Sequence, residues 1–230
     1  MASACVGARG TPWERGTVRS DVVVAWYGPD GAGKSTLVER VHQRLRRADP
    51  ACVVERRHWR PCLVPGPVRR RGNVDVTNPH GQGARSRSVA AVRDVLVGID
   101  FGLWWARHVI RRPWTRDSVR VVLWERYLDD ACLDPVRYRR PGSSSVLRLL
   151  AKLLPPVDLV VIVAGDPTTI ASRKHEVTAE RTAEALDRLR DHPFRARDRV
   201  WLDTTSDPVD ACVDTVLARL GRAAATRSVT

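Results

Sequence analysis

Short hydrophobic runs and longer stretches with helical spacing alternate along the chain. Residues 22–27 form a continuous run of β-branched and aromatic side chains, which is typical of a strand buried on both faces of a sheet. The next segment, 35–48, spaces its leucines and valines at helical intervals, and Pro50 predicts where that helix ends. The start of the pattern therefore indicates a buried strand followed by an amphipathic helix.

The same alternation continues to the end of the chain. Further strands are predicted at 51–59, 119–124, 158–164 and 199–203. Further helices are predicted at 89–110, 145–154, 167–173 and 178–190, and a last helix follows Pro208. Strands that alternate with helices favour a parallel sheet with right-handed crossovers. We therefore expect an α/β fold, built on a doubly wound five-stranded parallel sheet.

The chain has 230 residues, which is the size of one α/β domain. We expect this domain to span 21–221, with a flexible tail at 1–20 and a C-terminal tail at 222–230. Residues 61–88 are rich in proline, glycine and arginine and show little hydrophobic pattern. A loop of this length in a compact domain is either functional or disordered.

The chain is strongly basic, with a formal net charge of +13. Of its 39 basic residues 36 are arginines, a bias that GC-rich coding can produce, and they are spread through the predicted helices and loops. We therefore do not expect nucleic acid as a partner, and phosphorylated small molecules are the expected anions. The longest apolar runs have the length of strands, so no association with a membrane is predicted.

The five cysteines are odd in number and widely scattered, and none forms a C-x-x-C pair. This pattern favours neither a disulfide framework nor a zinc site. Together with a start that lacks the apolar segment of a secretion signal, it predicts a reduced, cytoplasmic protein. No cysteine chemistry is expected.

One motif carries specific chemistry. The octapeptide that begins at Gly28 and ends at Ser35 fits G-x-x-x-x-G-K-S/T, between a predicted buried strand and a predicted helix. Its glycines let backbone N–H groups turn toward phosphate oxygens, and the helix N-terminus adds partial positive charge. Lys34 is expected to reach the β- and γ-phosphates, and the Ser35 hydroxyl to bind Mg²⁺. The residues expected to bind ATP are Gly28, Asp30, Gly31, Ala32, Gly33, Lys34, Ser35 and Thr36.

A site for Mg-ATP also needs a carboxylate at the end of a neighbouring strand. Glu125 directly follows the strand predicted at 119–124 and is the preferred candidate. Asp166 follows another strand, but Pro167 comes next, and a role at the N-terminus of a helix explains it. Ser35 and Glu125 are thus the expected metal-side residues.

In these motifs the chain resembles the thymidylate kinase-like branch of the nucleoside monophosphate kinases. Asp30 and the Gly-Ala-Gly-Lys-Ser-Thr that follows are similar to the acidic phosphate loop of that family. Glu125-Arg126-Tyr127 resembles its Asp-Arg-Tyr motif, and Arg60 stands where the family places an arginine for the acceptor phosphate. The resemblance implies a P-loop NTPase fold with a helical lid, which we expect at 173–190, and places 61–88 on the acceptor side.

The resemblance also implies roles for individual residues. Asp30 would meet a sugar hydroxyl of the acceptor, and Arg60 and Arg126 would bind its phosphate. The residues that it implies in catalysis are Lys34, Arg126, Arg173 and Arg181. Phe101 and Trp105 lie on the helix that would line the acceptor pocket, where aromatic rings suit a base or sugar, although such residues also pack in cores.

The departures from the family lie on the acceptor side. Glutamate replaces aspartate at 125, no glutamine follows Tyr127, and the 61–88 loop is unlike that of a thymidylate kinase. The expected function is transfer of the γ-phosphoryl group of Mg-ATP to a small acceptor, most simply a nucleoside monophosphate. A kinase of another metabolite (a nucleoside, sugar or biosynthetic intermediate) and a nucleotide-binding protein without transfer remain alternatives. A homodimer is allowed.

Overall fold

A computed structural model gives the fold, and it describes residues 21–58, 86–111, 119–135, 137–140, 145–173 and 177–227. The tail expected at 1–20, Arg60 and most of the loop expected at 61–88 lie outside these ranges. In the part of the chain that is described, no helix is long and apolar enough to cross a membrane.

A five-stranded parallel sheet forms the centre of the molecule. Its strands are β1 (Val22–Tyr27), β2 (Val53–His58), β3 (Arg120–Glu125), β4 (Val157–Ala164) and β5 (Ala196–Asp203). They lie in the order β2-β3-β1-β4-β5, and every pairing between neighbours is parallel. The expected α/β fold and its five-stranded parallel sheet are confirmed.

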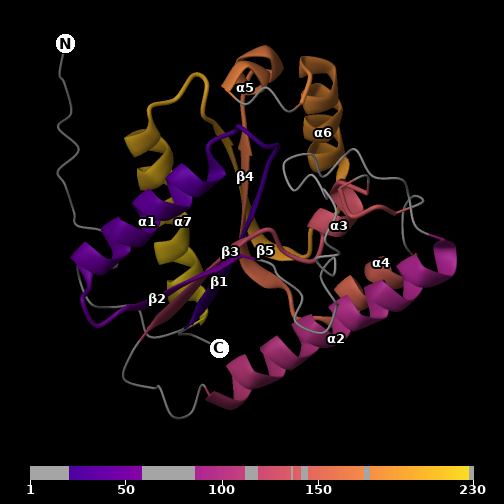
Figure 1. The fold of residues 1–230 in the computed structure, drawn as a ribbon. Coiled ribbons are helices and arrows are strands. Elements are labelled where there is room, and N and C mark those ends of the chain that lie inside the picture. The colour runs from indigo at the N-terminus through magenta and orange to yellow at the C-terminus, as the bar shows by residue number, and fades with distance from the viewer. Residues whose placement is uncertain are drawn as a thin grey trace, which may run out of the picture.

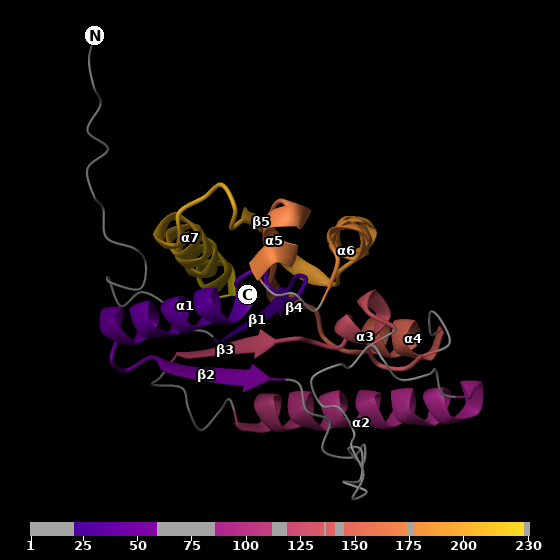
Figure 2. The ribbon, with the colours of Figure 1, turned by 45° about the horizontal axis from the view of Figure 1, so that its top comes forward.

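Helices cover both faces of this sheet, as Figures 1 and 2 show. They are α1 (Lys34–Ala48), α2 (Arg87–Arg111), α3 (Asp130–Leu133), α4 (Ser145–Leu153), α5 (Pro167–Arg173), α6 (Ala179–Asp191) and α7 (Val209–Arg227). α1 and α7 pack on one face, whereas α2, α3, α4 and α6 contribute to the core on the other. The sheet is therefore doubly wound.

Strand β1 shows why its run of apolar residues is continuous. Val22, Val24 and Trp26 point into the core beneath α1 and α7, while Val23 and Tyr27 point into the opposite core. All six residues of the strand are buried. A central strand covered on both faces needs apolar side chains at every position, which is the signal that the sequence carries.

Some boundaries differ from the sequence expectation. β5 begins at Ala196 rather than 199. The sequence signal is weak there, because Arg197, Asp198 and Arg199 are charged and alternate between exposed and half-buried at the edge of the sheet. The four-residue α3 was expected as loop. The last helix continues to Arg227, through most of the segment expected as a tail, and Ala224 is fully buried.

The topology positions the functional loop. β1 is the central strand, with β3 on one side and β4 on the other, so the strand order reverses at its carboxyl end. Ligands of open parallel sheets bind in the crevice outside such a switch point. The Gly28–Ser35 loop begins directly after β1 and therefore occupies this position.

Candidate active site

The loop between β1 and α1 is a tight backbone turn. Gly28 has a φ of +149°, and a Cβ there would lie 2.3 Å from the carbonyl oxygen of Val163 in β4, so only glycine fits. Gly33, with a φ of +89°, stands immediately before α1. The carbonyl of Ala32 accepts a 2.9 Å hydrogen bond from the Thr204 hydroxyl. The loop is thereby tied to the turn after β5.

Lys34, the first residue of α1, folds back over this loop. Its Nζ donates hydrogen bonds of 2.6 Å to the carbonyl oxygen of Gly28 and 2.7 Å to that of Pro29. It also lies 3.8 Å from Asp30 Oδ1. Burial lowers the pKa of Lys34 to about 8, although the charge of Asp30 opposes that effect. The ammonium is held by carbonyls that phosphate oxygens can replace.

Ser35 and Glu125 meet beside the loop. The Ser35 hydroxyl donates a 2.8 Å hydrogen bond to Glu125 Oε2, and Arg56 lies 2.9 Å from Oε1 while it also contacts Glu39. Burial alone would raise the pKa of Glu125, but the hydrogen bonds from Arg56 and Ser35 lower it below its usual value. A hydroxyl beside an ionised carboxylate is an oxygen pair that suits Mg²⁺.

These donors fit Mg²⁺ in the manner typical of nucleotide sites. Within the described ranges, no group of three or more histidine, cysteine or carboxylate side chains is placed to hold a metal. Mg²⁺ usually binds through one or two carboxylates together with water and substrate phosphates. Ser35 and Glu125 could supply the protein's part of such a set.

Two arginines converge on the acidic residue of the loop. Asp30 Oδ1 lies 2.6 Å from Arg126 Nη2, and its Oδ2 lies 2.6 Å from Arg137 Nη1. Arg126 follows β3 directly and has a φ of +68°. Its other terminal nitrogen donates a 3.0 Å hydrogen bond to Asp130 Oδ2, which also accepts from the Tyr138 hydroxyl at 2.6 Å. The guanidinium of Arg126 is thus fixed by carboxylates from two segments.

Electrostatics keep this cluster charged. Burial would raise the pKa of Asp30, but the positive charges of Arg126, Lys34 and Arg137 outweigh it and hold the pKa well below the usual range. Burial acts to lower the pKa of Arg126, and Asp130 and Asp30 reverse this effect and raise it. Asp30 and Arg126 therefore both carry their charge at neutral pH.

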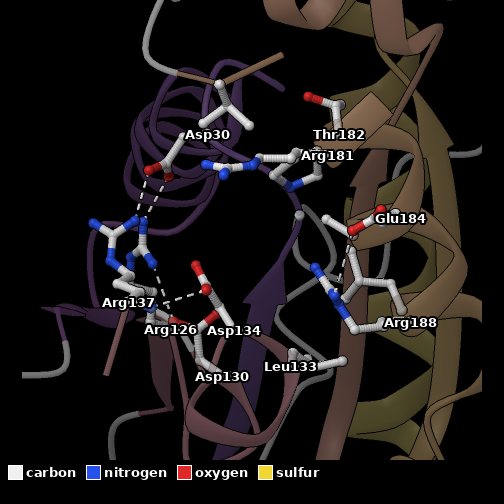
Figure 3. A pocket seen from close by; sticks show the side chains of 15 residues that line it. Asp30, Arg126, Asp130, Leu133, Asp134, Arg137, Arg181, Thr182, Glu184 and Arg188 are labelled. Atoms are coloured by element: carbon white, nitrogen blue, oxygen red, sulfur yellow. Dashed lines mark hydrogen bonds and ion pairs between the residues drawn. The ribbon is translucent and has the colours of Figure 1, made fainter. Parts of the chain in front are cut away.

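The cluster forms one wall of a pocket with a volume of about 220 Å³ (Figure 3). The loop at Gly28–Asp30, the segment that follows β3, and α6 enclose it. Its charged lining residues comprise four arginines and four carboxylates: Arg126, Arg137, Arg181, Arg188, Asp30, Asp130, Asp134 and Glu184. The pocket opens directly beside the phosphate loop.

The two arginines expected from the lid lie in different places. Arg181 is on α6 and lines the pocket. Arg173 ends α5, and its guanidinium donates a 3.2 Å hydrogen bond to the carbonyl oxygen of Thr204, on the side of the loop that faces β5. The structure brings Arg181 to the pocket that Arg126 lines, and it does not bring Arg173 there.

Phe101 and Trp105 lie in the core rather than in the pocket. Both belong to α2 and are almost fully buried in the core between this helix and the sheet, and Trp105 Nε1 donates a 2.5 Å hydrogen bond to the Tyr127 hydroxyl. The ring of Phe101 meets that of Tyr127 edge to face at 4.7 Å between centroids. The structure thus realises the core-packing alternative for these side chains. Asp166 hydrogen-bonds to the backbone N–H of Thr169 at the start of α5, as the alternative to a metal role predicts.

Sequence reasoning missed Arg137 and Arg56. Arg137 lies in a stretch that reads only as loop, and its partner Asp30 is more than a hundred residues away. Arg56 lies on an edge strand where a charged side chain needs no special explanation. Neither residue belongs to a motif, so only the folded arrangement reveals its position.

Comparisons with known proteins add a distant likeness. No protein-family model matches the sequence, and no significant match was found among curated proteins. A crystal structure of thymidylate kinase from Ehrlichia chaffeensis is similar over 86% of this chain and 97% of that chain, with 18% sequence identity and a TM-score of 0.48. A likeness this distant leaves substrate and activity to be argued from the site itself.

Proposed function

We propose that this chain is a kinase that transfers the γ-phosphoryl group of Mg-ATP to a small acceptor carrying a phosphate, such as a nucleoside monophosphate or a related phosphate ester. One observation carries the proposal: Asp30 belongs to the phosphate loop and also holds two arginines of the adjoining pocket. A donor on the loop and an acceptor among the arginines would meet at this residue. Mg-ATP is supplied in the cytoplasm, which is where we place the protein.

The proposed phosphoryl transfer requires the two substrates to be positioned accurately, but it does not require a general base. An oxygen of the acceptor phosphate attacks the γ-phosphorus, and a new P–O bond forms while the bond to the β,γ-bridging oxygen breaks. ADP leaves with the electron pair of that bond. A phosphate oxygen is ionised at neutral pH, so no proton has to be removed. The protein has to hold two polyanions in line and neutralise their charge.

The residues of the site suit this task. Lys34 would exchange its bonds to the loop carbonyls for the β- and γ-phosphate oxygens of ATP. Arg126 and Arg137, now shared with Asp30, would receive the acceptor phosphate. Mg²⁺, held by Ser35 and Glu125, would supply charge neutralisation at the phosphate oxygens. Each of these groups acts on charge that moves during transfer, where preorganised dipoles and ions act most strongly.

The test is a transfer assay with Mg-ATP and a pool of nucleoside monophosphates, nucleosides and sugar phosphates, analysed by mass spectrometry. We expect one acceptor to gain a phosphoryl group with the wild-type protein and not with Lys34→Ala. Lys152→Ala, at an exposed position on α4, is the matched control and should keep activity. ATP binding without any phosphorylated product, also when a cell extract supplies the acceptors, would favour a nucleotide-binding protein instead.

A further inference from the structure

We infer that the acceptor is a phosphorylated polyol, in the simplest case a sugar phosphate, rather than a nucleotide. The inference rests on the proposed function for the donor side, because it treats the 220 Å³ pocket beside the phosphate loop as the acceptor site. It follows from the balance of charged groups in the pocket, from where the nearby aromatic rings point, and from the size of the cavity.

The arginines provide the phosphate end of the site. Arg181 has no acidic partner among the described residues, and Figure 3 shows its side chain reaching from α6 across the pocket in the direction of Asp30. Arg126 and Arg137 approach the same carboxylate from the other wall. Guanidinium groups placed in this way suit the planar, multidentate recognition of phosphate oxygens.

The carboxylates provide a different specificity. Asp134 uses Oδ1 to accept a 3.1 Å hydrogen bond from the backbone N–H of Arg137, while its Oδ2 has no hydrogen-bond partner in the described ranges. Glu184 lines the α6 wall, with its carboxylate 3.9 Å from Arg188. Ionised carboxylates only accept hydrogen bonds, so a ligand has to offer them donors such as hydroxyl groups.

The count of charges supports the same reading. Four arginines and four carboxylates line the pocket, so the lining is formally neutral. A site for a bare polyanion gains from an excess of positive charge, and carboxylates in it cost affinity by repulsion. A ligand with a phosphate at one end and several hydroxyl groups at the other satisfies both sets of side chains.

The aromatic ring next to Arg126 in the sequence does not face the pocket. Tyr127 directly follows Arg126, yet its ring lies in the core, where its hydroxyl accepts the hydrogen bond from Trp105. None of the described residues that line the pocket is aromatic, and its apolar side chains are the aliphatic Pro29, Leu133, Val177, Ala185 and Leu189. Nucleobases are commonly bound by stacking on aromatic rings, and the described wall offers no such ring.

The part of the pocket that the described residues line is small. Its volume of about 220 Å³ lies below the roughly 300–1,000 Å³ usual for pockets that hold drug-sized ligands. A hexose or pentose phosphate is compact, and nearly every heavy atom of it is a polar oxygen or bears one. Within a small volume, such a ligand can therefore form hydrogen bonds with many of the eight charged side chains that line the pocket.

Calorimetric binding tests the inference separately from catalysis. The full chain, saturated with Mg²⁺ and a non-hydrolysable ATP analogue, is titrated with a hexose phosphate, a pentose phosphate, thymidylate and other nucleoside monophosphates. We expect a sugar phosphate to bind at least about tenfold more tightly than any nucleotide, because its hydroxyl groups can donate to the half-buried carboxylate of Asp134, and one hydrogen bond to a charged group changes affinity by about a factor of ten. Tighter binding of a nucleotide, or no binding of either sugar phosphate, overturns the inference.

Transfer assays on the same ligands keep the two proposals apart. Phosphorylation of a nucleotide with higher kcat/KM than any sugar phosphate would overturn the inference and leave the proposed kinase activity standing. Tight binding of a sugar phosphate without phosphorylation would support the inferred ligand and overturn the proposed kinase activity. The pocket would then hold the expected ligand, but no phosphoryl group would be transferred to it.

Three variants locate the recognition. Asp134→Asn keeps the acceptor for the N–H of Arg137 but replaces the second oxygen with a donor, so the sugar phosphate should bind about tenfold more weakly, while inorganic phosphate should bind at least as tightly as before. Arg181→Gln should weaken both by about tenfold to a hundredfold. Arg190→Gln, on the same helix but outside the pocket lining, should change neither. Equal effects of Asp134→Asn on both ligands would contradict the assigned role of the carboxylate.

Discussion

The phosphate loop and the pocket proposed to hold the acceptor lie side by side but are built in opposite ways. The loop consists of eight consecutive residues, and its shape depends mainly on the backbone. Gly28, for example, packs against the carbonyl of Val163, where no side chain would fit. The pocket is assembled from three segments, and the bond between Asp30 and Arg137 spans 107 residues. The loop therefore depends on a few strict positions, whereas the pocket depends on a balance of charges that can change without altering the fold.

The largest effect is expected on the loop side. Lys34→Ala should lower kcat by about a hundredfold to a thousandfold, because the ammonium stabilises charge that develops in the transition state. Thermal unfolding monitored by circular dichroism should show that the fold survives. A folded variant with near-wild-type turnover would contradict the division of the site into a loop and a pocket, since the loop would then not be where transfer occurs.

The next effect belongs to the pocket. Arg137→Gln should raise the KM of the acceptor by about tenfold to a hundredfold and leave ATP binding unchanged, because a charge-assisted bond to the acceptor is lost while the loop keeps its geometry. The complementary variant is Ser35→Ala, which should weaken the binding of Mg-ATP and leave the KM of the acceptor unchanged. If both variants changed both ligands equally, the division of the site into two parts would be wrong.

Alkaline pH should reduce activity through one group. The pKa of Lys34 is lowered to about 8, so the residue is a cation below that pH and loses its proton above it. We expect kcat/KM to fall about tenfold per unit as the pH rises beyond 8, because each unit reduces the protonated fraction tenfold. A profile that stays flat to pH 10, with the protein still folded, would show that Lys34 remains charged.

Removal of the carboxylate beside Ser35 should act on the metal. Glu125→Gln should raise the Mg²⁺ concentration needed for half-maximal binding of a fluorescent ATP analogue by about tenfold, in line with the loss of one charge-assisted contact. Glu39→Gln is the matched control, because Glu39 also contacts Arg56 but not the Ser35 hydroxyl. Identical behaviour of the two variants would mean that Glu125 only pairs with Arg56.

The smallest effect is expected for a core residue, Trp105, which tests whether this side chain acts in the core or in the pocket. Trp105→Phe removes the hydrogen bond to Tyr127 and some buried area, which should cost about 1–2 kcal/mol of unfolding free energy and lower Tm by a few degrees. The KM of the acceptor should not change, since Trp105 does not line the pocket. A KM raised more than tenfold in a stable variant would restore the expectation that this ring contacts the acceptor.

The fold was largely predictable from hydrophobic patterning. Buried strands such as β1 and β4 are continuous apolar runs, and sequence reasoning found them. The start of β5 was not found, because Ala196 is followed by three charged residues that alternate between exposed and half-buried at an edge, where the apolar signal is weak. The four-residue α3 is too short for any periodicity to show.

The site was predictable only where its parts are local. The spacing of Gly28, Gly33 and Lys34 identifies the loop, and the position of Glu125 at a strand end places it near Ser35, where the structure has it. Arg137 carries no local signal, since its role comes from the way the chain returns past Asp30. The sequence likewise leaves open whether Trp105 faces a ligand or the core, because both locations favour a large ring.

The central claim is phosphoryl transfer from the loop to a ligand in the pocket. Its most direct test is a reaction with ATP whose γ-phosphoryl oxygens carry a heavy isotope, followed by mass spectrometry of the acceptor. We expect the acceptor to gain the labelled phosphoryl group at the rate at which ADP appears, and Lys34→Ala to abolish both. Label that appears only in inorganic phosphate, at the same rate with and without acceptor, would contradict it.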